Sequence, residues 1–393
     1  MKKGWEISSI GDVCERTFNI NWNNENGPRK YIDLSTVSRE TFTVIECQVV
    51  NSQNAPSRAK KIISDNDVLF ATTRPTLRRV TIIEDKYNNA LCSTGFTVLR
   101  PQKARVLAKW LFNILITDGF MEYIEKRQKG ASYPAVTDND VKKFIIPVPP
   151  LPEQKRIVKI LDKAFQAIDK AKANAEKNLQ NAQELFESYL NGVFANPGED
   201  WEEKMLGEVC EVIGGGTPSK ANSKFYNGDI NWATVRDMKN EIINDTEYKI
   251  TVNAVKNSST NIIPRNNVII ATRVGLGKIC LIENDTAINQ DLRGVIPIHP
   301  NKLSVNFLYR WFKFIAPKIV EEGTGATVQG VKLPFIKSLI IFFPSLKKQK
   351  AIVLKLDTLS TETKRLDKIY QQKIADTEEL KKSILKKAFE GEL

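Results

Sequence analysis

Three side chains around one apolar run could hold a metal ion for DNA cleavage. Asp67 precedes the run VLF, and Glu84 and Lys86 follow the next apolar run, which ends with Ile82 and Ile83. A metal-dependent nuclease places two or three acids and a lysine at a strand end, because carboxylate oxygens bind Mg²⁺. The corresponding stretch in the second half has Asn267 instead of the first acid, and it has no lysine. A Mg²⁺-dependent nuclease is therefore one open alternative.

Basic, amide and hydroxyl side chains form a second set, which suits contact with DNA. Arginine pairs with guanine, Asn and Gln pair with adenine, and Ser and Thr hydroxyls bind phosphate oxygens. In both halves of the chain, Thr-Arg follows an apolar run and Gly-Ala-Ser/Thr precedes the last such run. The predicted DNA-contacting residues are Arg74, Arg78, Arg79, Lys129, Ser132 and Tyr133 in the first half, and Thr217, Ser219, Lys220, Thr272, Arg273, Lys278, Asn289, Gln290, Thr324, Thr327 and Gln329 in the second.

Two glycine-rich stretches do not match a nucleotide-binding loop. GGGTPS (214–219) and VGLGK (274–278) both lack the GxGxxG spacing, and VGLGK lacks the first glycine and the Ser/Thr of a P-loop. The chain also has no acidic-Pro-Pro-aromatic loop of the kind found in amino-methylating enzymes. We therefore predict that this chain binds no cofactor of its own.

Composition limits the class of protein further. The chain has 393 residues, of which 41% are hydrophobic and 26% charged, and this predicts a globular protein with two or more domains. No apolar run is long enough for a bilayer, so we expect no membrane association. Five scattered cysteines without a CxxC pair predict neither disulfides nor zinc, and they fit a reducing cytoplasm. The single histidine, His299, excludes a two-histidine metal site.

The charge of the chain points to a polyanionic partner. The net charge is +12, which favours nucleic acid through counterion release and long-range attraction. Residues 1–151 hold 22 basic and 16 acidic side chains, whereas residues 197–345 hold 17 and 16. Because the second half is almost neutral, local clusters rather than total charge must carry any DNA contact there.

The chain repeats one plan twice. Residues 130–162 align with 325–357 without a gap, and 14 of the 33 positions are identical. The openings also match, GWEISSIGDVCE over DWEEKMLGEVCE, and so do DVLFATTR and NVIIATR. The repeat predicts four segments, at 1–150, 151–196, 197–345 and 346–393, and it implies a pseudo-twofold arrangement.

The second and fourth segments have the pattern of long helices. Prolines precede both, and apolar residues recur at alternating spacings of three and four, which predicts an antiparallel coiled coil. Asn178 and Lys373 interrupt the apolar stripe at equivalent positions and would fix its register. The predicted seam is Ile157, Leu161, Ala164, Ile168, Ala171, Ala175, Asn178, Ala182, Leu185 and Tyr189, with Ile352, Leu356, Leu359, Thr363, Leu366, Tyr370, Lys373, Thr377, Leu380 and Ile384.

The first and third segments mix strands with helices. Six short apolar runs predict strands: DVLFAT, FTVLRP, FIIPVP, NVIIAT, KICLIE and LIIFFP. The stretches 105–130 and 306–325 each predict one amphipathic helix that ends at glycine. The predicted fold class is therefore α+β, with two similar mixed α/β domains separated by two long helices.

These features together resemble one known family. The repeated IPVPPLPEQKRIVKIL and FFPSLKKQKAIVLKL, the closing SILKKAFEGEL, and the run GGGTPSKANSKFYNGDINW resemble the specificity subunit of type I restriction-modification systems. The resemblance covers nearly the whole chain. It implies that the two mixed segments are DNA target-recognition domains, and that each reads one half of a bipartite site. The first half lacks the GGGTPS run and has RTFNINWNNENGPRKYIDLS there instead.

The resemblance also implies partners and a role without catalysis. The two helices would pack as a spacer and dock two methyltransferase (modification) subunits, and restriction/translocase subunits would join them. By the same resemblance, double-stranded DNA would be the ligand, and methyl transfer and cleavage would belong to the partners. Glu153, Gln154 and Gln349 lie at the repeated helix starts, so we predict that they dock the partner. A coiled-coil scaffold that binds proteins and not DNA is the other open alternative.

Overall fold

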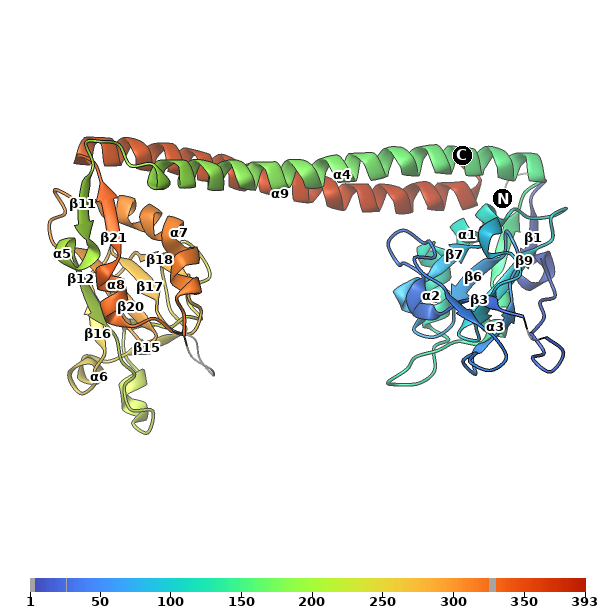
Figure 1. Cartoon of the computed structure of the whole chain (residues 1–393), viewed down its shortest axis with the longest axis horizontal. Helices are drawn as coiled ribbons and strands as arrows, with labels where there is room; N and C mark the ends of the chain where they lie inside the picture. Colours follow the sequence, from blue (N-terminus) through green and yellow to red (C-terminus); the bar gives the residue numbers. More distant parts are fainter. Residues whose placement is uncertain (1–3, 26, 325–329) are drawn as a thin grey trace. The chain divides into compact units, whose positions relative to one another are not determined.

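The computed structural model describes residues 4–25, 27–324 and 330–393 and divides into two compact units (Figure 1). The first unit is Met1–Glu176 with Gln371–Leu393, and the second is Lys177–Tyr370. Each unit therefore contains one mixed domain and parts of two long helices, α4 (Leu151–Ala195) and α9 (Leu346–Glu390). Within the described residues, no helix combines the length and the apolar character that crossing a membrane requires.

The first domain contains two four-stranded sheets, with strand orders β2-β9-β6-β7 and β4-β3-β8-β5, and a two-stranded sheet of β1 and β10. All four residues of β6 are buried, so this strand is central to the core. Its elements are β1 (Glu6–Ser9), β2 (Cys14–Glu15), β3 (Arg29–Ile32), β4 (Gln48–Val50), β5 (Ala59–Ile62), β6 (Val68–Ala71), β7 (Val80–Ile82), β8 (Leu91–Ser93), β9 (Phe96–Pro101), α1 (Ala108–Leu115), α2 (Asp118–Glu125), α3 (Asp138–Lys142) and β10 (Ile145–Val148).

The second domain repeats this topology strand for strand and adds β14 at one edge. Its sheets are β12-β20-β17-β18-β14, β15-β13-β19-β16 and β11-β21, and β13 pairs with β19 in parallel as β3 does with β8. Its elements are β11 (Glu202–Met205), α5 (Leu206–Val209), β12 (Cys210–Gly214), β13 (Ile230–Ala233), β14 (Ile242–Ile243), β15 (Tyr248–Ile250), α6 (Val252–Lys256), β16 (Asn261–Ile263), β17 (Val268–Ala271), β18 (Ile279–Ile282), β19 (Thr286–Ile288), β20 (Leu292–Pro297), α7 (Val305–Glu321), α8 (Leu333–Ser338) and β21 (Ile340–Phe343).

The predicted fold class and internal repeat are confirmed, but one predicted helix is wrong. All six predicted strands are present, as β6, β9, β10, β17, β18 and β21. The stretch 105–130 forms two helices, α1 and α2, instead of one. Thr117 breaks it: its hydroxyl donates to the carbonyl of Ile114 at 2.7 Å and accepts from the backbone N–H of Phe120 at 3.2 Å. A threonine that caps a new helix stops the preceding one.

A buried glutamine joins each long helix to the domain before it. In the first unit, Gln154 accepts from the N–H of Leu107 (2.9 Å) and donates to the carbonyls of Arg105 (2.8 Å) and Pro149 (2.7 Å). The side chain has no exposed surface. Its amide therefore satisfies three backbone groups at the point where the domain meets α4.

Gln349 repeats this contact in the second unit. It accepts from the N–H of Ser304 (2.9 Å) and donates to the carbonyls of Lys302 (2.7 Å) and Pro344 (2.8 Å), and it too is fully buried. The predicted docking role of both glutamines therefore needs revision. Neither amide is accessible to a partner, so any effect on assembly must pass through the position of the helix.

The far end of each helix packs into the core of a domain. Phe389 near the end of α9 contacts Trp110 of the first domain, with ring centroids 4.9 Å apart, and Leu385 belongs to the same core. Phe194 near the end of α4 contacts Phe307 of the second domain at 5.2 Å. Each domain thus rests on the beginning of one long helix and the end of the other.

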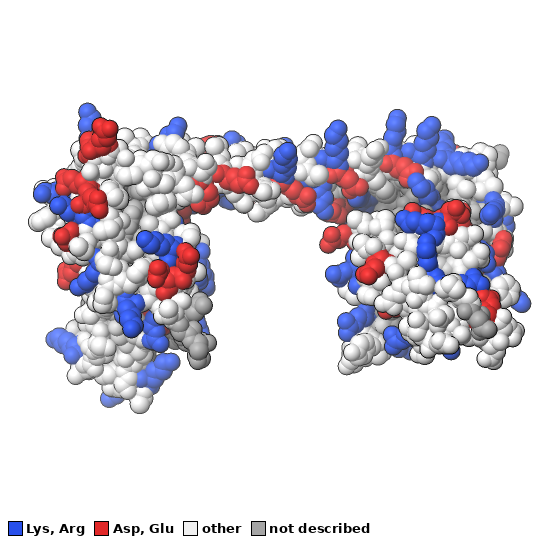
Figure 2. Space-filling model, in the orientation of Figure 1, with Lys and Arg blue, Asp and Glu red and all other residues white. Residues whose placement is uncertain are grey.

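The two helices pack antiparallel within each unit. In the first unit, Lys172 pairs with Glu378 at 2.6 Å, and Asp169 pairs with Lys381. In the second unit, Gln183 donates to Asp367 at 3.0 Å, and these two residues are the repeat equivalents of Glu378 and Lys172. Figure 2 shows basic and acidic side chains interspersed along the helix pair, as such pairing requires.

Part of the predicted seam is wrong by one position. Ala171, Asn178, Leu185, Lys373 and Leu380 are exposed. The polar pair expected to fix the register therefore lies outside the seam. The other fifteen predicted seam positions are buried or half-buried, and the half-buried residues next to the five exposed ones are Lys172, Leu179 and Phe186 in α4 and Ile374 and Lys381 in α9.

Removing the amide of Gln154 should destabilise the protein strongly. Gln154→Ala leaves one N–H and two carbonyls without this partner in a buried site, which costs about 2–4 kcal/mol of unfolding free energy. Urea unfolding followed by circular dichroism measures this loss. Gln180→Ala is the matched control on the same helix, because Gln180 is exposed and should cost less than about 0.5 kcal/mol. Equal losses for the two variants would contradict the role of Gln154.

The revised seam makes a second prediction with two leucines of one helix. Leu179 is half-buried, whereas Leu185 is 62% exposed. Leu179→Ala should lower the unfolding free energy by about 1–2 kcal/mol, and Leu185→Ala by less than about 0.5 kcal/mol. The same unfolding experiment measures both, and the reverse order would restore the seam predicted from sequence.

Candidate nucleic-acid interface

Two loops meet at the same place in both domains. One loop follows β6 or β17, and the other precedes α3 or α8. In the first domain the N–H of Val136 donates to the carbonyl of Thr72, and in the second Val331 donates to Thr272, both at 2.9 Å. In the first domain the predicted Thr-Arg and Gly-Ala-Ser motifs therefore lie on neighbouring loops, whereas the second Gly-Ala-Thr motif (325–327) lies outside the described residues.

In the first domain these loops bring four predicted residues together. Arg74 has a left-handed backbone (φ 48°), and its guanidinium lies 4.9 Å from the ring centroid of Tyr133, which is 70% exposed. Lys129 and Ala135 exchange backbone hydrogen bonds of 2.9 Å, and exposed Ser132 lies in the loop between them. An arginine against an exposed aromatic ring offers both hydrogen bonds and a stacking surface to a nucleic acid.

Arg78 and Arg79 have partners inside the first unit instead. Arg78 donates to Asp118 at 2.7 Å, and Arg79 donates to the carbonyls of Leu34 (2.6 Å) and Val37 (2.9 Å). Burial raises the pKa of Asp118, but its hydrogen bond with Arg78 and the charge of Lys382 outweigh this, so the pKa is lowered overall. Both arginines therefore hold the loop in place.

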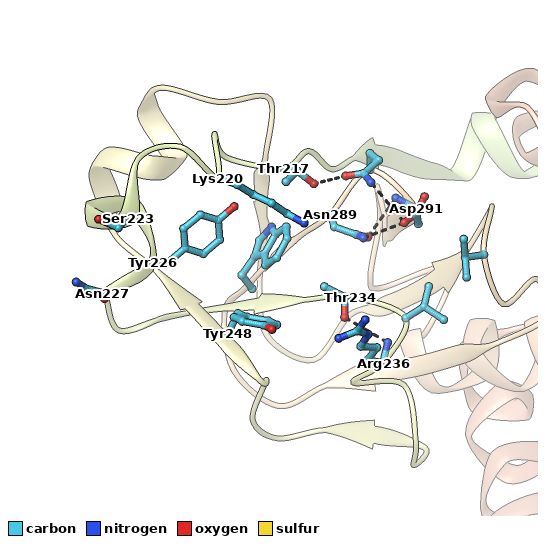
Figure 3. Close-up of a pocket in the computed structure, with 14 residues that line it drawn as sticks. Thr217, Lys220, Ser223, Tyr226, Asn227, Thr234, Arg236, Tyr248, Asn289 and Asp291 are labelled. Carbon is cyan, nitrogen blue, oxygen red and sulfur yellow. Dashed lines mark hydrogen bonds between the residues drawn. The ribbon is translucent and has the colours of Figure 1, made fainter. Parts of the chain in front are cut away.

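The second domain has a pocket of about 870 Å³ among its loops (Figure 3), which we call the recognition pocket because several predicted DNA-contacting residues line it. Residues from six segments line it: the loop after β12, the strand β13 and the loop after it, the strand β15, the loop after β17, and the turn between β19 and β20. Four of the predicted residues are among them, Thr217, Lys220, Asn289 and Gln290. The sequence thus located part of this site.

Asp291 organises the polar side of the pocket. Its carboxylate accepts from the side-chain amides of Asn289 (3.0 Å) and Gln290 (3.5 Å), and it lies 3.6 Å from the guanidinium of Arg273. Thr217, labelled in Figure 3, donates to the amide oxygen of Gln290. Gln290 is therefore held at both ends while it stays exposed, and an oriented amide is suited to reading the edge of a base.

Aromatic rings form the other side of the pocket, and sequence reasoning did not identify them as site residues. Tyr226, Trp232 and Tyr248 line it, with Tyr226 and Tyr248 5.9 and 6.4 Å from the ring of Trp232. Trp232 donates to the carbonyl of Gly216 at 3.1 Å, and Tyr226 to that of Pro218 at 2.7 Å. The interleaving of aromatic with Asn and Lys residues in KANSKFYNGDINW was the available signal. Arg236, also at the pocket, had no such signal.

The GGGTPS stretch has a packing role. A Cβ on Gly215 would lie 2.2 Å from the carbonyl oxygens of Ile288 and Asn289, and one on Gly216 would lie 2.2 Å from Ser259. Only glycine allows this approach. The stretch therefore lets the exit from β12 pack on β19 and brings Thr217 to Gln290.

The remaining predicted residues of the second domain are scattered. Thr272 is 2% exposed, and its N–H donates to the carbonyl of Asp291 at 2.8 Å, so it supports the turn and does not face a ligand. Arg273 is exposed beside the pocket, whereas exposed Lys278 lines a different cavity. Ser219 and Thr324 are exposed in their loops. Thr327 and Gln329 lie outside the described residues.

The geometry does not support the nuclease alternative. Both carboxylate oxygens of Asp67 accept from Arg100, at 2.9 and 2.8 Å, and Asp67 is fully buried. Glu84 pairs with Lys86 at 2.9 Å. Among the residues that the structure describes, no group of three or more His, Cys, Asp or Glu side chains could hold a metal ion.

Comparison with known proteins identifies the fold. The family described as type I restriction modification DNA specificity domain matches residues 2–178 and again 198–375. The EcoR124I/EcoR124II specificity subunit of Escherichia coli is 34% identical over 273 residues, which cover 66% of this chain and 65% of that relative.

Two solved structures match the whole chain at 26% identity. One, from a study of complex assembly and conformational transition in a type I R-M system, has a TM-score of 0.87 and is covered to 99%. The other, the HsdS subunit from Thermoanaerobacter tengcongensis, has a TM-score of 0.72 and is covered to 98%. Both cover 100% of this chain. With the family model matched twice, at the two copies of the internal repeat, this chain belongs to the type I restriction-modification DNA specificity family.

Proposed function

We propose that this chain is the specificity subunit of a type I restriction-modification complex and that each of its domains reads one half of a bipartite DNA site. One observation carries the proposal: the two domains share a backbone but differ in the side chains of equivalent loops. Thr72 and Thr272 both donate to a turn carbonyl at 2.8 Å, of Gly95 and Asp291 respectively. The turn is Ser-Thr-Gly (93–95) in one domain and Asn-Gln-Asp (289–291) in the other.

Such a pair of turns suits recognition of two different base sequences. A common backbone places both turns alike against a duplex, while the different hydroxyl, amide and carboxylate groups select different bases. In the second domain Gln290 and Arg273 are the side chains best placed to read bases. In the first domain Arg74 and Tyr133 have this position. The chain itself carries no catalysis in this proposal, and methyl transfer and cleavage belong to its partners.

The partners in this proposal are two methyltransferase subunits, which restriction/translocase subunits join. Exposed apolar residues recur at equivalent positions of the repeat, and this supports two matching docking faces. Leu185 is 62% exposed and its equivalent Leu380 is 48% exposed, and Ile145 and Ile340 form a second such pair at 57% and 41%. Glu153 is half-buried and pairs with Arg156 at 2.7 Å, whereas its equivalent Lys348 pairs with Asp200. The apolar pairs are thus better docking candidates than the predicted glutamines.

The proposal is tested by co-expressing this chain with the methyltransferase subunit encoded beside it and mapping the methylated bases in the host DNA. The wild-type chain should give one bipartite motif. Arg273→Ala should relax or weaken recognition of one half-site only, by about 1–3 kcal/mol, because Arg273 belongs to a single domain.

Arg265→Ala is the matched control, since this exposed arginine of the same domain does not line the recognition pocket. It should leave the motif unchanged. Equal weakening of both half-sites by Arg273→Ala would make Arg273 a phosphate or structural contact. A wild-type chain that binds the methyltransferase but gives no motif and no sequence preference would favour the protein-only scaffold.

The docking faces make a separate prediction. Leu185→Ala combined with Leu380→Ala should weaken binding of methyltransferase subunits at least tenfold and leave the unfolding free energy nearly unchanged, because both side chains lie on the surface. Sedimentation velocity with purified subunits measures assembly. Ala171→Ser combined with Lys373→Gln, at other exposed positions of the same helices, is the control. Unchanged assembly in the leucine variant would exclude these positions from the interface.

A further inference from the structure

A small cavity at one corner of the second unit gathers four lysines. It has a volume of about 310 Å³ and lies among the segment before β14, the start of β18, and the helices α7 and α9. Lys239, Lys278, Lys313 and Lys364 line it, one from each of these elements. Glu241 is the one carboxylate among the described residues that line the cavity. We call this site the lysine cavity.

The carboxylate of Glu241 is already shared by other cations. It lies 2.8 Å from Lys364 and 3.8 Å from Arg310, which also pairs with Asp357 of α9 at 2.7 Å. Burial raises the pKa of Glu241, but the hydrogen bond and charge of Lys364 and the charges of Arg310 and Lys313 lower it by more. The single negative charge of Glu241 is thus shared with Lys364 and Arg310, and it cannot balance all four lysines of the cavity.

Three of the lysines lack a neutralising partner in the part of the chain that the structure describes. Lys239, Lys278 and Lys313 have no carboxylate within 4 Å there. Lys313 is half-buried, and its ammonium group lies 5.5 Å from the ring centroid of Tyr309. Like charges held around one cavity repel one another, and an anion inside it would remove that repulsion.

The loop 274–278 connects the lysine cavity with the recognition pocket. Val274 lines the recognition pocket and Lys278 lines the lysine cavity. Between them, Gly275 and Gly277 have left-handed backbones, with φ of 75° and 83°. A Cβ on Gly277 would lie 2.8 Å from Val320 of α7. The loop is therefore closely packed, and it fixes the lysine cavity next to the place where bases would be read.

We propose that the lysine cavity binds a phosphate group of the DNA backbone beside the bases read by the second domain. The inference rests on the proposed function, and it adds a sequence-independent anchor at the junction of this domain with α9. Ammonium groups are compact point charges that suit phosphate oxygens. The site also explains how a domain with almost no net charge could hold a polyanion.

The first domain does not share this arrangement. Arg79 is the equivalent of Lys278. The carbonyl of Arg79 accepts from the N–H of Ala71 at the end of β6, and the carbonyl of Lys278 accepts from the N–H of Ala271 at the end of the equivalent strand β17. Arg79 is engaged by the carbonyls of Leu34 and Val37. The phosphate anchor is therefore specific to the second half, where total charge is lowest.

The test compares DNA binding of the assembled methyltransferase complex at several salt concentrations. With Lys278→Gln and Lys313→Gln together, the dissociation constant should rise roughly tenfold at 0.1 M salt. The slope of log K against log salt should become shallower by about 1, since one phosphate contact contributes roughly 0.9. The loss should be the same for the cognate duplex and for one with an altered second half-site.

Two further variants separate charge from packing. Lys302→Gln with Lys318→Gln makes the same charge change at exposed positions of this domain outside the lysine cavity. It should change the slope by less than half as much as the Lys278 and Lys313 double variant does. Lys278→Arg with Lys313→Arg keeps the charge and should restore the slope.

The other outcomes would overturn the inference in distinguishable ways. Wild-type affinity and slope in the double glutamine variant would remove the phosphate anchor and leave the proposed function intact. If that variant fails to bind the methyltransferase, the lysine cavity binds an acidic segment of the partner protein and not DNA. If inorganic phosphate binds the chain but does not compete with DNA, the lysine cavity is a site for free anions and not for the DNA backbone. A wild-type complex without sequence preference would remove the proposed function and this inference with it.

Discussion

The contact on which the rest of the structure depends is the buried glutamine at each helix start. Gln154 and Gln349 each use one amide to satisfy three backbone groups, two from the segment that leads into α1 or α7 and one from the proline turn. Leaving any of these buried hydrogen-bonding groups without a partner would cost folding free energy. The geometry around each glutamine amide is therefore strongly specified. The orientation of each long helix on its domain therefore follows from one side chain.

Everything that recognises DNA in the proposal is supported by this frame. The sheets place the recognition loops, and the loops are held by internal contacts such as Arg78–Asp118 and Asp291–Asn289. Arg74, Tyr133, Arg273 and Gln290 are among the predicted residues that stay exposed at the ends of these loops. A rigid support with a small variable surface allows the recognised sequence to change without a change of fold.

The sequence was sufficient for the repeat, the strands and the long helices, because these depend on long apolar patterns. It was insufficient where neighbouring positions carry similar residues. Leu179 and Leu185 both fit an apolar stripe, and only packing shows that the first lies in the seam. The glutamines looked like surface residues because their partners, Leu107 and Ser304, lie more than 40 positions away in the chain. The aromatic wall of the pocket was missed for the same reason, since Trp232 and Tyr248 meet only through strand pairing.

The placement of Phe389 in the core of the first domain affects how the chain is made. A domain usually folds as it leaves the ribosome, but Trp110 must wait for a ring that is synthesised almost 280 residues later. At ~5–20 residues per second this delay is roughly 15–55 s. The second domain, whose Phe194 precedes it in the chain, has all of its core partners soon after its own synthesis. The first domain, although synthesised first, therefore completes its core after the second domain. Until Phe389 is synthesised, the apolar surface that this ring covers stays open to chaperones.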